Sequence, residues 1–202
     1  MEKEFDHGEV LQRLKRLSFL SALAFLLSCA ERLYPNYLAF LRHHGWGNAD
    51  AIRESLDLGW TVLEGGNVDG DRIDDVRSRC QDAEPDTEHF DSVYVSPALD
   101  AASVAGILLD FIRAKDVNSV AEAASLCRDT VDMYIQELES MDANAPDLEA
   151  RILAHPLMQR ELARQRGDIE RLSEYVETLD VESLKSDWRS PSTSNIGLPT
   201  TG

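Results

Sequence analysis

The sequence predicts an all-α protein: a single-domain, multi-helix bundle with a buried central helix and a non-helical C-terminal tail. Apolar residues recur at spacings of three and four along most of the chain, and capping residues, Gly or Pro separate these segments. No stretch alternates apolar and polar residues for long enough to form a sheet. The 202 residues, 43% of them hydrophobic, suffice for a sizeable core. We expect one helical domain over residues 1–189 and an extended tail over 190–202.

The most apolar segment, RLSFLSALAFLLSCAERLYPNY (16–37), predicts the central helix at about residues 18–33, with Ser18 as its N-cap. Only 14 uncharged residues separate Arg16 from Glu31. As a helix they would span about 21 Å, which is short of the roughly 30 Å hydrocarbon layer. The LLSC that ends at Cys29 resembles a lipoprotein signal, but acidic residues precede it where a signal needs cationic ones. We therefore expect a buried helix and a cytoplasmic protein without a membrane anchor.

The other helices are predicted in order around this one. Residues 9–17 are amphipathic and come before it. Pro35 predicts a break and a new helix that ends at HGWGN, where Gly45 is the expected C-cap and Asn48 the next N-cap. A capping box, SVAE, starts another helix at Ser119. The remaining helices are expected at 49–64, 72–80, 98–114, 119–141, 144–155, 156–179 and 180–188.

Charge and cysteine content exclude several classes of function. The formal net charge of −17 repels phosphate backbones and anionic lipids, so nucleic acid and membranes are not expected partners. The three cysteines are far apart and form no C-x-x-C pair, which argues against a disulfide framework and a zinc site. No nucleophile elbow, phosphate-binding loop, metalloprotease motif or calcium loop is complete, so no catalytic, cofactor or metal residue is predicted.

Three carboxylates in apolar surroundings are the candidate site residues: Glu31, Asp57 and Asp100. Buried carboxylates must be paired or neutralised. One interpretation is structural, with ion pairs to arginines or, for Asp100, a helix N-terminus. The other is a small polar pocket for a metal or a cationic ligand. The arginines available for pairing are Arg32, Arg42 and Arg53.

The long helix predicted at 156–179 carries a narrow apolar stripe that includes Leu162, Ile169, Leu172 and Val176. Such a seam packs either within its own bundle or against a partner helix, so a protein partner or a homodimer is an open alternative. In the tail, we expect Ile196 to Leu198 to dock on the helical body, with residues 190–194 as a mobile tether and 199–202 free.

Five segments together resemble a known family. They are AERLYPNYLAF, GWGN, LDLGW, SPALDAA and SNIGL, and they occur in the order and spacing of the YjaG-like bacterial proteins, domain-of-unknown-function family 416, over residues 11–198. The resemblance implies a helical cytoplasmic protein with no assigned reaction, and an association with histidine kinases that suggests signalling. Two functions follow as hypotheses: a non-enzymatic interaction or signalling module, or a ligand-binding protein or enzyme that uses the three carboxylates.

Overall fold

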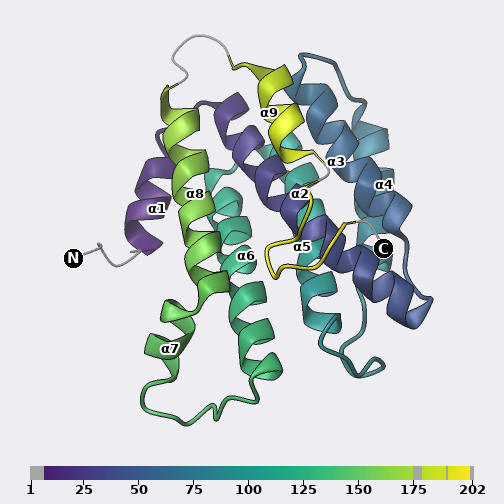
Figure 1. Ribbon diagram of the computed structural model, residues 1–202. Helices are drawn as coiled ribbons and strands as arrows, with labels where there is room; N and C mark the ends of the chain where they lie inside the picture. The colour runs from purple at the N-terminus through teal and green to yellow at the C-terminus, as the bar shows by residue number, and fades with distance from the viewer. Residues whose placement is uncertain (1–6, 175–178, 190, 201–202) are drawn as a thin grey trace.

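The computed structural model describes residues 7–174, 179–189 and 191–200 (Figure 1). In these ranges the chain forms helices and their connections and no β-strand, which confirms the predicted all-α class. The helices are α1 (His7–Leu14), α2 (Phe19–His44), α3 (Ala49–Leu63), α4 (Gly70–Asp82), α5 (Val95–Ala114), α6 (Val117–Leu138), α7 (Leu148–Ala154), α8 (Pro156–Glu174) and α9 (Val181–Trp188).

Helix α2 is the centre of the bundle and contacts α3, α5, α6, α8 and α9 (Figure 1). Leu23, Leu26 and Leu27 are 0% exposed, as predicted for the central helix. Cys29 is also fully buried, so the segment that resembles a lipoprotein signal lies in the middle of α2, inside the protein. The apolar run therefore serves as the core of the fold.

The predicted break at Pro35 is wrong, because α2 continues through this residue to His44. A proline inside a helix lacks the backbone N–H and costs about 3 kcal/mol. The residues after it are anchored: Asn36, Tyr37 and Phe40 are buried, and the Tyr37 hydroxyl donates a hydrogen bond to the Ala83 carbonyl at 2.7 Å. Packing on the far side of the proline offsets the local cost and keeps the helix continuous.

The predicted caps are mostly confirmed. Ser18 accepts a hydrogen bond from the Ser21 amide at 3.1 Å, and Gly45 ends α2 in the left-handed conformation with φ +64°. Asn48 caps α3. The start of α6 differs from the prediction, because Asp116, and not the box at 119–122, accepts a hydrogen bond from the amide of the second helical residue. Asp116, three residues upstream of Ser119, caps the helix because its side chain accepts a hydrogen bond from a free amide of the first turn.

Helix α5 is the one described helix that is long and apolar enough to cross a membrane, but 61% of its most apolar window is buried inside the bundle. It packs against α2, α3, α4 and α6. Gly106 allows α4 to approach closely: a Cβ at this position would lie 3.0 Å from the guanidinium carbon of Arg77 on α4. The apolar surface of α5 is thus covered by neighbouring helices.

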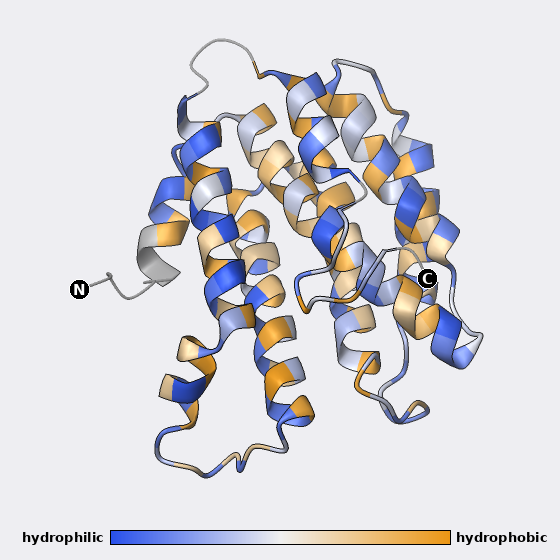
Figure 2. Cartoon of the chain, in the orientation of Figure 1, coloured by the Kyte–Doolittle hydropathy of each residue, from blue (hydrophilic) through white to orange (hydrophobic). Residues whose placement is uncertain are grey.

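The apolar stripe of α8 is used within the chain. Leu162, Ile169 and Leu172 are at most 4% exposed and belong to the hydrophobic clusters of the bundle. Figure 2 shows hydrophobic residues alternating with hydrophilic ones along α8, as expected for a helix with one face in the core. Val176 lies outside the described residues. Ile169 and Leu172 therefore pack in the main core, and Leu162 packs in the smaller apolar cluster with residues of α6 and α7.

The C-terminal segment docks more fully than predicted. Ile196 is 3% exposed and packs among apolar residues of α6, α7 and α8. Ser194, expected in a mobile tether, is fully buried, and its amide donates to the Leu198 carbonyl at 2.8 Å. Pro199, expected to be free, forms an isolated antiparallel bridge with Thr193. Residues 191–200 thus form a small loop that folds back on itself and lies across α2 and α6 (Figure 1).

The buried position of Leu26 predicts a large loss of stability on truncation. Leu26→Ala removes packed methyl groups and should lower the free energy of unfolding by about 2–5 kcal/mol. Leu20 is on the same helix and is 41% exposed, so Leu20→Ala is the matched control and should change stability by less than about 0.5 kcal/mol. Urea unfolding followed by circular dichroism measures both, and equal losses would contradict the assignment of α2 as the central helix.

Candidate functional site

Glu31 links α2 to α3 through hydrogen bonds and an ion pair. It is 1% exposed, and Arg53 donates to both of its oxygens, at 2.9 and 2.7 Å. The indole N–H of Trp60 adds a third hydrogen bond at 2.7 Å. Two parallel N–H···O bonds are the strongest arrangement for a buried carboxylate. The carboxylate is therefore fully engaged, as the interpretation based on arginine pairing predicted.

Asp57 shares Arg53 with Glu31 and also accepts a hydrogen bond from Arg189, at 2.9 Å. Its side chain is 43% exposed. Asp100 is bonded elsewhere: the Thr130 hydroxyl on α6 donates to it at 2.6 Å. The structure therefore joins Glu31 and Asp57 through one arginine and attaches Asp100 to a different helix.

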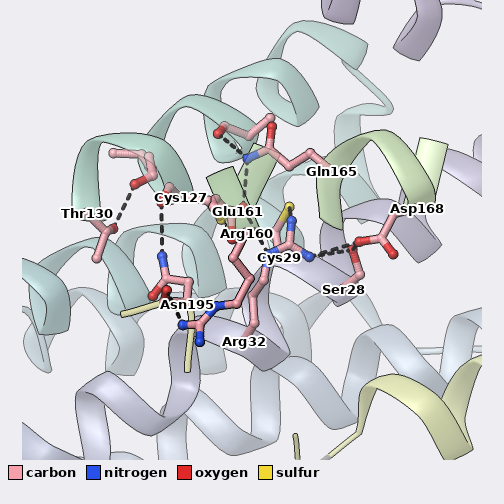
Figure 3. Close-up of polar contacts among 12 residues, drawn as sticks. Ser28, Cys29, Arg32, Cys127, Thr130, Arg160, Glu161, Gln165, Asp168 and Asn195 are labelled. Atoms are coloured by element: carbon pink, nitrogen blue, oxygen red, sulfur yellow. Dashed lines mark hydrogen bonds and ion pairs between the residues drawn. The ribbon is translucent and has the colours of Figure 1, made fainter. Parts of the chain in front are cut away.

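A buried polar cluster around Arg32, which the sequence did not predict, joins α2 to α8 (Figure 3). Arg32 is 5% exposed. Its Nε donates to Glu161 Oε1 at 3.1 Å and its Nη1 donates to Asp168 Oδ2 at 3.0 Å. Ser28 donates to the same Asp168 oxygen at 2.8 Å, and Gln165 Nε2 donates to Glu161 Oε1 at 2.8 Å.

The C-terminal segment closes this cluster on the side of α2 and α6. The Asn195 amide donates to the Arg32 carbonyl at 3.1 Å, and its side chain is held by Asn36 at 2.9 Å and by the Cys127 carbonyl at 3.0 Å. Arg160 Nη2 donates to the Asn195 carbonyl at 2.8 Å (Figure 3). Asn195 is 0% exposed. The segment SNIGL therefore meets the segment ERLYPNY at this point of the fold.

The chemistry of the cluster is structural. Both of its carboxylates contact Arg32, and burial raises the pKa of the Cys127 thiol, with its hydrogen bond to Cys29 raising it further. Burial also raises the pKa of Cys80 to about 12. A nucleophilic cysteine needs the opposite shift. Among the described residues, no group of three or more His, Cys, Asp or Glu side chains could hold a metal ion.

A groove of about 440 Å³ lies between α6, α7 and α8. Ile152, Met158 and Leu162 are at most 6% exposed and form its apolar floor. Leu148 and Leu153 of α7 continue the lining, and Leu153 is 36% exposed. This volume is within the range typical of ligand sites.

The polar rim of the groove is mainly acidic. Asp129 and Asp132 come from α6 and Glu149 comes from α7, whereas Arg128 is the one cation of the lining. Asp132 accepts a hydrogen bond from Gln136 at 2.6 Å. The ion pairs of the described residues do not include Asp132 or Glu149, so both carboxylates can receive a cation from outside the chain. This groove could not be predicted from the sequence, because the spacing of apolar residues does not reveal that α7 packs over α6 and α8.

The environment of Asp100 predicts a pH effect on stability. Burial raises the pKa of Asp100 to about 6, the Thr130 hydrogen bond opposes this rise, and Asp129 adds to it. The folded state therefore holds this proton more tightly than the unfolded state, so stability falls as the pH rises from about 4 to 6 and the charge costs stability above that range. Asp100→Asn keeps an acceptor for Thr130 and removes the charge.

We expect Asp100→Asn to stabilise the protein by about 1–2 kcal/mol at pH 7.5 and to lose most of this advantage near pH 4.5. Asp110→Asn, an exposed change on the same helix, is the control. Denaturant unfolding of all three proteins at both pH values gives the comparison. An advantage for Asp100→Asn that is the same at both values would rule out a raised pKa as its cause.

The chain is similar to proteins whose names state no function. The chain is 28% identical to the uncharacterized protein YjaG of Escherichia coli over 191 residues, which cover 92% of this chain and 94% of the relative. An uncharacterized protein of Haemophilus influenzae is 26% identical, with 93% and 95% covered. A crystal structure of a DUF416 family protein from Shewanella baltica matches with a TM-score of 0.85 and 26% identity, over 94% of this chain and 97% of that chain. Because the model of that family also matches residues 9–199, the chain belongs to DUF416, a family of proteins of unknown function.

Proposed function

We propose that the protein is a non-enzymatic interaction module of the cytoplasm, and that the groove between α6, α7 and α8 is the place where a partner protein docks. The observation that carries the proposal is a groove of about 440 Å³ with buried apolar residues at its base and exposed apolar side chains beside it. Leu153, on the groove wall, is 36% exposed, and Met133 is 53% exposed. Met133 is four residues after Asp129 and lies about 40° further around the axis of α6. It therefore lies beside the groove.

The ionisable groups of the interior support an interaction module over an enzyme. Glu31 accepts hydrogen bonds from Arg53 on both of its oxygens, and Glu161 accepts one from Arg32 on Oε1, so each carboxylate links two neighbouring helices. Protein-binding surfaces combine apolar and polar groups, and the lining of the groove contains both. A histidine kinase is the partner that the family resemblance suggests, and signalling is the role that would follow from it.

Site-specific photo-crosslinking tests the docking site. A photoreactive amino acid in place of Leu153 should give discrete crosslinked adducts with another protein in the cells that produce this protein. The same amino acid in place of Glu182, exposed on α9, is the control and should give none of these adducts. Identical adducts from both positions, or none from position 153, would contradict docking at the groove. A crosslink from position 153 to a second copy of this chain would replace the partner protein by a homodimer and overturn the proposal.

A further inference from the structure

We propose that the groove binds a basic amphipathic helix of its partner, a helix with Leu-type residues on one side and Lys or Arg on the other. This inference rests on the proposed docking function and adds the chemistry of the partner. Three features support a basic amphipathic helix: the apolar base of the groove, its acidic rim and the charge of the whole protein.

The floor selects for apolar side chains. Met158, Leu162 and Ile152 are buried apolar side chains at the base of the groove, and Leu148 and Leu153 stand beside them. A volume of about 440 Å³ accommodates a few aliphatic side chains rather than an entire helix. An amphipathic helix would insert the apolar residues of one face and keep its remaining surface outside. Met158 adds an adaptable surface, because its unbranched side chain adjusts to different partners.

The rim selects for cations. Asp132 and Glu149 stand on opposite walls, on α6 and α7, and neither forms an ion pair with another described residue. Two walls of negative charge about an apolar floor match a helix whose basic residues flank an apolar stripe on both sides.

The charge of the whole molecule acts in the same direction. A net charge of −17 attracts basic segments from a distance and repels acidic ones. The long-range field is not specific to the groove, so it raises the association rate for any basic helix. Specificity must therefore come from the local arrangement of Asp132, Glu149 and the apolar floor, and the experiment has to separate the two contributions.

Fluorescence anisotropy with a labelled helical peptide of leucine and lysine, about 14 residues long, measures the interaction. Asp132→Asn/Glu149→Gln should weaken binding about fivefold, because each exposed ion pair contributes only about 0.5 kcal/mol. Asp71→Asn/Glu182→Gln removes the same charge from exposed positions on α4 and α9 and is the matched control. It should weaken binding by less than about twofold. Circular dichroism establishes that both variants remain folded.

A third variant separates the apolar contribution. Leu153→Ser should also weaken binding, and its effect should persist at high salt, where the effect of the two carboxylates is screened. A peptide with glutamate in place of lysine should not bind.

Equal losses for the two charge variants, or equal binding of the glutamate peptide, would overturn the proposed partner chemistry. If the crosslinks from position 153 persist in that case, the groove still docks a partner, but of another kind. If those crosslinks are absent as well, the proposed function fails together with this inference.

Discussion

The buried guanidinium of Arg32 is the constraint on which the placement of α8 and the C-terminal segment depends. An unpaired charge in the interior costs several kcal/mol, so Arg32 can remain on the central helix only if carboxylates reach it. Glu161 and Asp168 both come from α8, and together they fix the rotation of that helix. Because adjacent helical residues point about 100° apart, a helix that turns Glu161 toward α2 turns Met158 and Leu162 toward α6 and α7. The groove thus lies next to the face of α8 that contacts Arg32.

Much of the fold follows from local sequence signals. The apolar run from Leu23 to Leu27 predicted the central helix, because apolar side chains on all sides of a helix are stable only when they are buried. Ser18, Gly45 and Asn48 marked helix ends because their chemistry satisfies free backbone groups. Pro35 gave the wrong boundary, since local propensity is a weak preference that the packing of Tyr37 and Phe40 overrides.

The candidate site could not be predicted in the same way, because its contacts join distant parts of the chain. Arg32 is 129 residues from Glu161, and Asn36 is 159 residues from Asn195. The sequence showed an arginine directly after an apolar run and a polar Gln165 within an apolar stripe, and these two departures from the pattern were the available signals. The spacing of apolar residues identifies the buried face of a helix but not the helix against which it packs. The sequence therefore offered several arginines as partners for Glu31 without selecting Arg53.

Hydrogen–deuterium exchange of the Arg32→Met variant tests the central claim, that Arg32 holds α8 and the C-terminal segment to α2. The account predicts that amides of α8 and of residues 191–198 exchange at least about tenfold faster than in the wild type, while α3 and α5 keep their protection. Arg113→Met is the control, because it removes an exposed pair with Asp74 and should leave every region unchanged. Unchanged protection of α8 and of the Asn195 amide in Arg32→Met would contradict the account.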